Sequence, residues 1–437
     1  MTPWLVRGLL LPAHERLRGR ATLAELAALR RGEQRPDALY RLRREKLAAL
    51  LEHCRDRVPF YRARLSATGA LEVTDFPVLE RDTVREHGAA LCSDHEPRKL
   101  LPSSTGGSSG RPLTFWTDTV KETRHNAHKL RFRCWFGVRP GDRQVDFWGS
   151  PVELSKSSRF RRFKDQYLLN QALCSAHDLS TERLEAYVRF LGRFRPHLVY
   201  GYPTVIARVA HQAASHPRLL GGWRPDLVVC TSEMLYPQLR EAITAGLGAP
   251  PVANEYGSRD AGLTAHECRQ GRLHIAAEHV WVEVDAPDAS GVGDLLITNL
   301  DGYGMPLVRY RVGDRGRISD EACPCGSPLP VLDRLEGRRN DFLVGTEGRR
   351  IHGSAANYVL RAVPQVVQYR LVQRTDRSLD IQVVADADWG ESEEREVAEG
   401  LRRTLGMEVP VRFERVSLIP PSASGKYRWV ESEALES

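Results

Sequence analysis

The sequence has no long apolar run. Its most hydrophobic opening stretch, residues 4–11, is broken by Arg7 and followed by Pro12 and His14. A membrane-spanning helix needs about 20 consecutive apolar residues. We therefore predict no membrane span.

Cysteine is also scarce, with 8 in 437 residues. This number is too small for a disulfide-rich scaffold, and the N-terminal residues lack the pattern of a secretory signal. We therefore expect a cytoplasmic protein with reduced thiols.

Aromatic residues make up only 8% of the chain, and they do not interleave with the basic residues behind its net charge of +7. The basic residues are densest around Arg30, Arg31 and residues 41–44, with acidic residues such as Glu33 and Asp37 between them. A helix face open to water explains this pattern better than a nucleic-acid surface. We therefore predict no nucleic-acid partner.

The length predicts two or three domains, and the hydrophobic pattern divides the chain into three parts. Residues 1–66 have leucines at helical spacing, which predicts an N-terminal helical region packed on the large domain. Residues 67–337 form the expected large domain, and residues 338–437 a small α+β domain.

Within the large domain, short apolar runs alternate with helical patterns, which predicts a parallel sheet flanked by helices. The expected elements are 144–148, 181–194, 198–200, 203–214, 226–230 and 236–245. Further β segments with turn signals between them predict a barrel-like subdomain: 273–275, 280–284, 294–298 and 307–311. The predicted fold class is α/β.

A glycine- and hydroxyl-rich loop occupies residues 103–112, Ser-Ser-Thr-Gly-Gly-Ser-Ser-Gly-Arg-Pro. Small residues let backbone N–H groups converge on an anion, and the hydroxyls of Thr105, Ser108 and Ser109 can donate to the same oxygens. Arg-Pro replaces the Lys-Ser/Thr of a Walker loop, and the strand-like residues that follow predict a loop between two strands. The loop is either a polyphosphate cradle or a mobile surface loop.

Four further motifs follow this loop along the chain. They are Asn254–Asp260 (Asn-Glu-Tyr-Gly-Ser-Arg-Asp), Tyr310–Asp314 (Tyr-Arg-Val-Gly-Asp), Gly337–Asp341 (Gly-Arg-Arg-Asn-Asp) and Ser424–Lys426 (Ser-Gly-Lys). In this order the five motifs resemble those of adenylate-forming ligases, most closely the phenylacetate-CoA ligase branch with its coenzyme F390 synthetase and CapK-like relatives. Shorter similarities at 58–61 and 201–203 extend the resemblance over nearly the whole chain.

The resemblance implies an enzyme of two steps. In these ligases ATP and a carboxylic acid give an acyl adenylate and pyrophosphate, and a thiol then takes the acyl group. The chain is thus expected to be an AMP-forming ligase that joins an aryl or arylalkyl acid to CoA. The alternative acceptors are a carrier-protein thiol, an amine, or a phenolic hydroxyl that takes AMP. A further alternative is that the chain is an inactive nucleotide-binding scaffold. Expected ligands are the acid, ATP, Mg²⁺ and CoA, with a homodimer as a possible assembly.

The resemblance also assigns the ATP site. The implied ATP-binding residues are Ser104, Thr105, Gly106, Gly107, Ser108, Ser109, Gly110, Glu255, Tyr256, Gly257, Asp314 and Arg338. Tyr256 is expected near adenine, with the backbone of residues 255–257 lining the purine and acyl pockets. Asp314 suits the paired ribose hydroxyls because a carboxylate accepts two hydrogen bonds, although an ordinary Gly-Asp turn is the alternative. Arg338 is expected near ribose and phosphate, or else in a surface ion pair.

Two residues are expected to act in the chemistry. Asp260 stands where the family usually has a glutamate that helps to hold Mg²⁺, and its shorter side chain suggests a water-bridged contact or help from Glu255. Lys426 is expected to reach the α-phosphate and stabilise the transition state as a compact charge. Taken alone, residues 254–260 are equally explained by a tight turn after a strand, and Lys426 by a solvated surface lysine.

Relatives rotate the small domain after adenylation. The pivot falls on Asn340, where many relatives have aspartate, and asparagine tolerates unusual backbone angles. Gly345 and Gly348 are expected on a hairpin that approaches the thiol tunnel, or else in a plain β-turn.

Three cysteines and one histidine predict a metal site. They are Cys268, His274, Cys323 and Cys325. Three thiols and an imidazole suit tetrahedral Zn²⁺, and relatives in this branch can carry a structural zinc in this region. The Cys-x-Cys spacing is tighter than the usual Cys-x2-Cys of zinc sites. His266 and His279 are alternative fourth ligands. If no metal binds, the cysteines are simply unpaired and buried.

The sequence says little about which carboxylic acid is the substrate. Residues at the expected strand ends can bound a pocket for an aryl or arylalkyl acid: Phe147, Trp148, Tyr202 and Glu233. Aromatic residues at such places can also simply pack the core.

Overall fold

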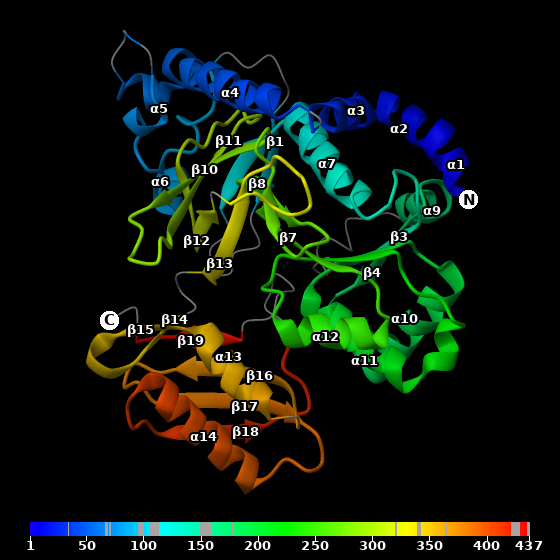
Figure 1. The fold of residues 1–437 in the computed structure, drawn as a ribbon, viewed down its shortest axis with the longest axis vertical. Coiled ribbons are helices and arrows are strands. Elements are labelled where there is room, and N and C mark those ends of the chain that lie inside the picture. Colours follow the sequence, from blue (N-terminus) through cyan, green and yellow to red (C-terminus); the bar gives the residue numbers. More distant parts are fainter. Residues whose placement is uncertain are drawn as a thin grey trace. The chain divides into compact units, whose positions relative to one another are not determined.

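The computed structural model divides the chain into two compact units (Figure 1). Unit 1 contains Met1–Val312 and Gly316–Leu335, and unit 2 contains Gly313–Arg315 and Glu336–Ser437. The described residues are 1–33, 35–65, 69, 71–94, 100–104, 113–148, 159–176, 179–319, 321–338, 342–363, 365–420 and 429–434. Within them, no helix is both long and apolar enough to cross a membrane.

Unit 1 begins with helices. They are α1 (Pro3–Leu5), the π-helix η1 (Val6–Leu10), α2 (Leu11–Leu17), α3 (Thr22–Gly32), α4 (Pro36–Arg57), α5 (Pro59–Arg62), the 3-10 helix η2 (Val73–Asp75) and α6 (Arg81–Glu86). In α4 the buried residues Leu47, Leu50, Leu51 and Cys54 recur at helical spacing, and this face packs into the main core. The amphipathic pattern of the sequence therefore decides which face of α4 is buried.

An alternation of strands and helices follows. The elements are β1 (Leu101–Ser104), β2 (Thr114–Thr117), α7 (Thr119–Cys134), β3 (Gln144–Trp148), α9 (Arg159–Leu168), β4 (Gln171–Ser175), α10 (Thr181–Phe194), β5 (Leu198–Gly201), α11 (Pro203–Ser215), η3 (Pro217–Leu220), β6 (Leu227–Thr231) and α12 (Pro237–Gly246). Asp118 caps α7, because its carboxylate accepts from the N–H groups of Val120 (2.7 Å) and Lys121 (2.9 Å). β5 and β6 are buried along their whole length, as central parallel strands are.

The rest of unit 1 is strand. It comprises β7 (Val252–Ser258), β8 (Gly262–Glu267), β9 (Leu273–Ile275), β10 (Val280–Asp285), β11 (Gly293–Asn299), β12 (Tyr310–Ser319) and β13 (Val331–Arg338). The sequence-based start of the last expected strand at residue 307 is wrong: Arg309 has a φ of +51°, and its N–H is bonded to the Thr298 hydroxyl (2.8 Å). The chain therefore turns at Arg309, and β12 begins one residue later.

Among the described residues, eleven strands form one mixed sheet. The order is β10-β11-β12-β13-β9-β8-β7-β6-β5-β3-β4. β4, β3, β5, β6 and β7 are parallel, whereas β7–β8, β8–β9, β9–β13 and β10–β11 are antiparallel. The predicted α/β class and helix-flanked parallel strands are confirmed, and the strands expected in a barrel-like subdomain continue the same sheet.

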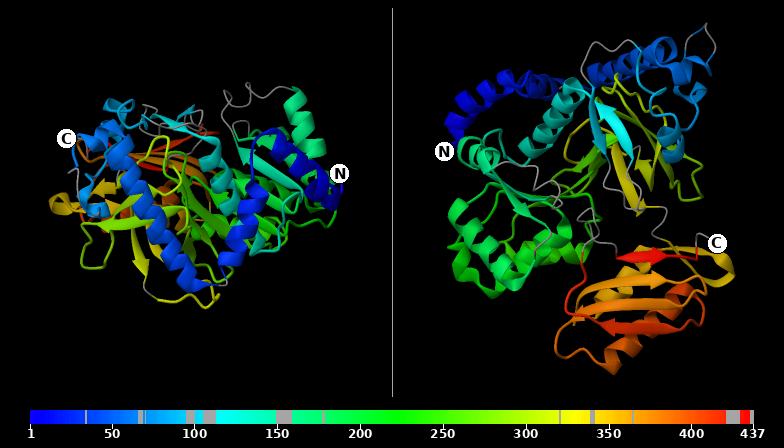
Figure 2. Two further views of the ribbon diagram at one scale, coloured as in Figure 1. Left: turned by 90° about the horizontal axis from the view of Figure 1, so that it is seen from above. Right: turned by 180° about the vertical axis from the view of Figure 1, so that it is seen from behind.

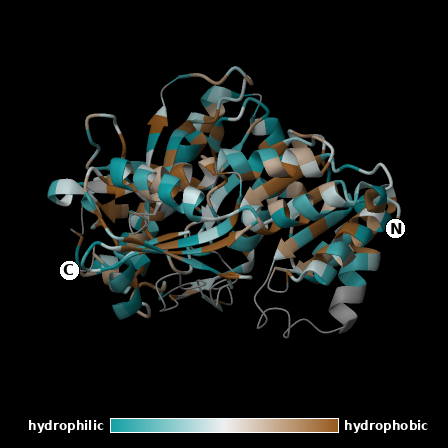
Figure 3. Cartoon of the chain, turned by 90° about the horizontal axis from the view of Figure 1, so that it is seen from below, coloured by the Kyte–Doolittle hydropathy of each residue, from teal (hydrophilic) through white to brown (hydrophobic). Residues whose placement is uncertain are grey.

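Helices cover both faces of the parallel strands. Figure 2 shows α10–α12 on one side of these strands and α7 toward the other. Successive side chains of β3 point to opposite faces of the sheet. Phe147 packs edge-on against Tyr187 of α10, while its neighbour Trp148 stacks on Tyr200. Figure 3 shows apolar residues along the strands between these helices.

Unit 2 is a small α+β domain. It contains β14 (Phe342–Val344), η4 (Thr346–Gly348), β15 (Arg350–His352), α13 (Gly353–Ala362), β16 (Val366–Gln373), β17 (Leu379–Ala385), α14 (Glu391–Leu405), β18 (Val411–Arg415) and β19 (Val430–Ser432). A sheet of order β18-β17-β16-β19 shares its own core with α13 and α14. β14 and β15 form an antiparallel hairpin that contains Gly345 and Gly348.

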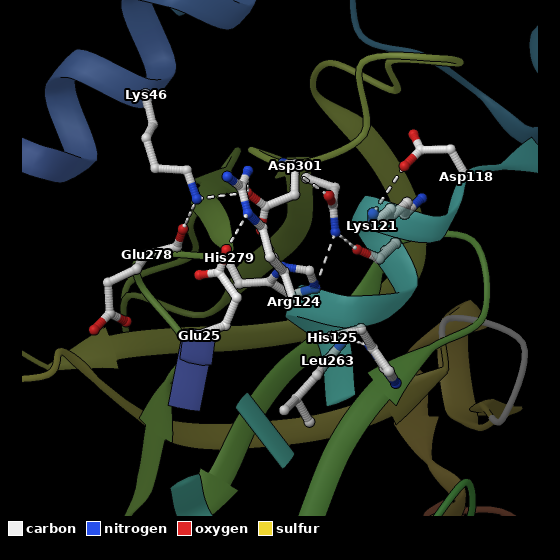
Figure 4. Close-up of polar contacts among 12 residues, drawn as sticks. Glu25, Lys46, Asp118, Lys121, Arg124, His125, Leu263, Glu278, His279 and Asp301 are labelled. Atoms are coloured by element: carbon white, nitrogen blue, oxygen red, sulfur yellow. Dashed lines mark hydrogen bonds and ion pairs between the residues drawn. The ribbon is translucent and has the colours of Figure 1, made fainter. Parts of the chain in front are cut away.

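A buried carboxylate, Asp301, ties the helices of unit 1 to the sheet (Figure 4). Its Oδ1 accepts from Lys46 Nζ of α4 (2.6 Å) and from Arg124 Nη1 of α7 (2.7 Å). Its Oδ2 is bonded to Nδ1 of His279 (2.6 Å), directly before β10. Burial alone would raise the pKa of Asp301, but the His279 hydrogen bond and the Lys46 and Arg124 charges hold it well below its usual range.

His128, His279 and Asp301 lie close enough together to hold a metal ion. A divalent cation nevertheless does not fit this group, because Lys46 and Arg124 already neutralise the carboxylate and would repel a second positive charge. We therefore interpret the contacts of Asp301 as structural.

Asp301→Asn should destabilise unit 1 strongly. The variant leaves Lys46 and Arg124 without their buried partner, which costs about 3–5 kcal/mol. Asp333→Asn is the matched control, because Asp333 pairs with the exposed Arg317 and loss of a solvent-screened pair should cost far less. Urea denaturation of both variants measures the difference, and equal losses would show that Asp301 is not a structural hub.

Candidate functional site

The predicted phosphate loop starts at the end of β1. β1 and β2 pair antiparallel with Ser104 opposite Thr114, so the loop connects the two strands of a hairpin, as the sequence predicted. Residues 105–112 themselves lie outside the described residues. The Ser104 carbonyl oxygen is 3.5 Å from Nη1 of Arg259, in the turn between β7 and β8. The entry to the loop therefore lies beside that turn.

Asp260 lies in the same turn, and the protein holds its carboxylate from both sides. Oδ1 accepts from the Ser258 hydroxyl and from the Ala261 N–H (3.1 Å). Oδ2 accepts from the Tyr310 hydroxyl (2.9 Å), and Lys121 of α7 donates to the Asp260 carbonyl (3.1 Å). The residue is 6% exposed. Three of the carboxylate's four or so acceptor positions are therefore used.

Tyr256 and Gly257 precede this turn on β7. Tyr256 is half-buried against the main core, and the pairing with β8 shifts between these two residues. A Cβ added to Gly257 would lie 2.5 Å from the Gly262 carbonyl oxygen, so only glycine allows the two strands to approach this closely.

The remaining predicted nucleotide and hinge residues are spread along the chain. Asp314 is half-buried in β12, after Gly313 with its φ of +87°. Arg338 is the last residue of β13. Asn340 and Lys426 lie outside the described residues. The assigned roles of these residues stay predictions.

The predicted tunnel glycines lie on the β14–β15 hairpin of unit 2. A Cβ on Gly345 would lie 2.5 Å from the Leu405 carbonyl oxygen of α14, so the hairpin packs closely on that helix. Gly348 has a φ of +75°, which favours glycine.

A row of polar residues at intervals of four runs along α7: Lys121, His125, Lys129 and Arg133. This spacing keeps them on one face of the helix. The His125 Nδ1 accepts from the Leu263 N–H of β8 (3.2 Å; Figure 4). Burial, with the nearby charge of Lys129, lowers the pKa of His125 well below 6.5, so this ring is neutral.

Lys129 meets a buried acid on the sheet. Its Nζ lies 2.7 Å from the Tyr200 hydroxyl and 3.4 Å from Oε1 of Glu255. The Tyr200 hydroxyl donates to the same Oε1 (2.8 Å). Burial alone would raise the pKa of Glu255, but Lys129 and Arg133 outweigh it and lower the pKa to about 2. Glu255 is therefore an anion at neutral pH.

Aromatic side chains line the same face at the strand ends. Trp148 at the end of β3 stacks on Tyr200 (ring centroids 5.8 Å apart) and on Tyr202 (4.6 Å). Glu233 lies after β6 and accepts from the Thr204 hydroxyl at the start of α11 (2.7 Å). Of the four predicted acyl-pocket residues, Trp148 and Tyr202 thus lie together, whereas Phe147 faces α10.

The four predicted metal ligands converge. Their ligand atoms all lie within 4.8 Å of one another: Cys268, His274, Cys323 and Cys325. The Sγ atoms of Cys268 and Cys323 are 3.7 Å apart, and Cys325 Sγ is 3.3 Å from Nε2 of His274. Tetrahedral zinc with Zn–S bonds of about 2.3 Å places two sulfurs about 3.8 Å apart.

The orientation of His274 also suits a ligand. Its Nδ1 lies 3.1 Å from the Leu329 carbonyl oxygen and therefore carries the proton. Nε2 is left with a lone pair directed at the sulfurs, which is the arrangement found in metal-ligating histidines. The alternative ligand His266 instead stacks on Phe132, and His279 is bonded to Asp301.

Comparisons with known proteins identify related sequences. A family model described as the CapK C-terminal domain matches residues 343–433. Protein CapK of Staphylococcus aureus is 25% identical over 370 residues, which cover 82% of this chain and 79% of that protein. A phenylacetate-coenzyme A ligase of Thermus thermophilus is 26% identical over 398 residues, which cover 85% of this chain and 84% of that enzyme. The chain is a homologue of CapK and of phenylacetate-CoA ligases.

A solved structure of another CoA ligase is similar in fold. The structure of 2-hydroxyisobutyryl-CoA ligase in the postadenylation state, in complex with 2-HIB-AMP, matches with a TM-score of 0.69 and 20% identity. The match covers 91% of this chain and 89% of that one. The predicted fold and the resemblance to adenylate-forming ligases are therefore confirmed.

The polar row of α7 is the part of this ligase fold that sequence reasoning missed. The helix itself was not expected, because its charged residues hide the usual apolar stripe. The available signal was the repeat of basic residues every fourth position, after a helix-capping Asp118.

Lys129→Met should destabilise the chain in a pH-dependent way. The folded-state pKa of Glu255 lies below its unfolded value, so its ionised form stabilises the protein above about pH 4.5 and loses that effect as the pH falls toward 2. Without Lys129 the buried anion loses its nearest positive charge and retains only the more distant Arg133, so we expect a loss of about 3 kcal/mol at neutral pH.

Urea denaturation at several pH values measures this effect. The gap between wild type and variant should shrink as the pH falls from about 4.5 toward 2, where Glu255 of the wild type becomes protonated. Lys164→Met is the control, since Lys164 pairs with the partly exposed Asp165. A gap that is independent of pH would contradict the assigned charge of Glu255.

Proposed function

We propose that the chain is an AMP-forming ligase that activates a carboxylic acid with ATP and transfers the acyl group to CoA. The observation that carries the proposal is the contact of Arg259 with the Ser104 carbonyl. It brings the entry of the predicted triphosphate loop to the turn that holds Asp260. The named relatives support the same activity.

In the first step a carboxylate oxygen attacks the α-phosphorus of ATP, the bond to the bridging oxygen breaks, and pyrophosphate leaves. In the second step the CoA sulfur attacks the acyl carbon, AMP leaves, and the thiol proton passes to solvent. The chain must therefore orient the two reactants in line and neutralise the developing charge. We assign orientation to Tyr256 and Asp314, and charge neutralisation to Lys426.

Asp260 fits an indirect role toward Mg²⁺. Three hydrogen bonds keep its carboxylate in place and leave about one acceptor position, which suits one water of the ion better than the ion itself. Bound Mg²⁺ would offset the negative charge of the phosphates. The protein's own part is to hold that acceptor still.

We also propose that Cys268, His274, Cys323 and Cys325 hold a structural Zn²⁺. The sulfur spacing and the tautomer of His274 support this assignment. Four protein ligands leave no open position, so a catalytic role does not fit. Such an ion would fix the β8–β9 hairpin to the segment before β13, close to Trp135 at the end of α7.

Lys426→Ala should remove adenylation while ATP still binds. Loss of the charge on the α-phosphate should lower the rate of acid-dependent pyrophosphate release by about a hundredfold or more. Release is measured over aryl, fatty and hydroxy acids, with and without CoA. Lys164→Ala on α9 controls for the loss of one positive charge. Unchanged release by Lys426→Ala with an accepted acid would refute the role of this lysine.

The same screen tests the proposed function as a whole. An acyl-CoA product formed only with CoA supports the thiol acceptor. Transfer of AMP to a phenolic hydroxyl, or no ATP turnover with any acid, would contradict the proposal.

The purified protein should contain one zinc ion per chain, measured by elemental analysis. Cys268→Ala should lose the metal and unfold at a lower temperature, because zinc binding contributes to folding energy. Cys92→Ala is the control, since Cys92 lies outside the cluster and its Sγ donates to the Gly88 carbonyl. Near-zero metal in the wild type would exclude the site.

A further inference from the structure

Two buried acceptor atoms are neighbours on the sheet face beneath α7. Glu255 on β7 pairs with His266 on β8, so their side chains leave the sheet on the same face. Glu255 is 4% exposed and His266 is fully buried. Among the described residues, neither Oε2 of Glu255 nor Nε2 of His266 has a hydrogen-bond partner.

The other contacts of these side chains fix both atoms as acceptors. The Tyr200 hydroxyl and Lys129 engage Oε1 of Glu255, which leaves the lone pairs of the anionic Oε2 unused. The Nδ1 of His266 lies 2.8 Å from the Glu267 carbonyl oxygen and so carries the ring proton. With the ring proton on Nδ1, Nε2 has a lone pair that can accept a hydrogen bond.

Unfilled buried acceptors are costly, at about 1–3 kcal/mol each. The pair therefore requires a group that donates hydrogen bonds. Lys129 and Arg133 place positive charge beside Glu255 and disfavour a cationic donor. A neutral amino or hydroxyl group satisfies both conditions.

The position of the pair relates this donor to the proposed acid. Glu255 is followed directly by Tyr256 and lies opposite Thr231 in the sheet register. Thr231 is the last residue of β6, and the parallel pairing of β6 with β7 ends at Glu255. Ligands of such sheets bind at the carboxyl ends of the parallel strands. Trp148 ends β3 on the same face, and its stack with Tyr202 provides an aromatic surface at that edge.

We propose that Glu255 and His266 select an acid whose acyl group carries a neutral amino or hydroxyl substituent. This inference rests on the proposed ligase function and names its substrate class. An aromatic amine donates to both acceptors, a phenolic hydroxyl to one, and a methyl group of similar size to neither. The site should therefore rank the three in that order.

The test compares benzoic and phenylacetic acids with an amino, hydroxyl or methyl group at the same ring position. Calorimetric titration measures the Kd of each acid, and pyrophosphate release is followed in parallel. At one ring position we expect the amino-substituted acid to bind at least about a hundredfold more tightly than its methyl-substituted analogue. The methyl group leaves both acceptors unpaired.

Glu255→Gln should reduce this ratio to about tenfold or less, since a neutral amide is a weaker acceptor than a carboxylate. Glu185→Gln on the surface of α10 is the matched control and should keep the wild-type ratio. His266→Leu provides a second variant in case Glu255→Gln does not fold. It should lower the preference for amino over hydroxyl acids and leave the preference for hydroxyl over methyl acids.

The outcomes separate this inference from the proposed function. Equal Kd values for the three acids at every ring position would overturn the inference even if pyrophosphate is released, and would indicate that water fills the two acceptors. Tight, Glu255-dependent binding of the amino-substituted aryl acids without pyrophosphate release would support the inference and contradict the proposed ligase activity.

Discussion

The structure of unit 1 depends on how α7 buries its charges. Most surface helices bury an apolar stripe, but α7 places positive groups against the sheet and pairs two of its lysines with acceptors there. Lys121 donates to the Asp260 carbonyl, and Lys129 meets Glu255. On a neighbouring face, the fully buried Arg131 donates to Glu278 (2.6 Å). Because an unpaired buried charge is far more costly than a lost apolar contact, these pairs fix the position of the helix.

This arrangement connects packing to the proposed chemistry. The first turns of α7 support the Asp260 turn through Lys121, and the next turns set the charge of Glu255. At its end, Trp135 packs edge-on against His274 of the cysteine cluster. A single helix therefore links the proposed phosphate, acyl and zinc sites, and disturbance of one of them should be felt at the others.

The sequence predicted the parts whose signals are local. The helix Thr181–Phe194 and the strands Gln144–Trp148 and Leu273–Ile275 have the predicted bounds, because apolar spacing and capping decide them within a few residues. The four residues of the cysteine–histidine cluster could also be chosen, since few residue types bind zinc. The order of the five motifs was enough to indicate the ligase fold.

Long-range contacts could not be predicted in this way. Nothing local in the sequence shows that Lys129 meets Glu255, 126 residues later, or that His266 lies beside that acid in the sheet. These pairs depend on the strand order and on the register of β7 with β8. Phe147 and Trp148 likewise have different neighbours because their side chains lie on opposite faces of the sheet. Which face is covered by which helix is fixed only when α7 and α10 are in place.

The most direct test of the account is a crystal structure of the chain with a non-hydrolysable acyl-adenylate analogue of an amino-substituted aryl acid. We predict adenine beside Tyr256, ribose hydroxyls on Asp314, and the amino group within about 3 Å of Glu255 Oε2 and His266 Nε2. An acyl group bound away from the α7-covered face, with Glu255 and His266 bonded only to water, would contradict it.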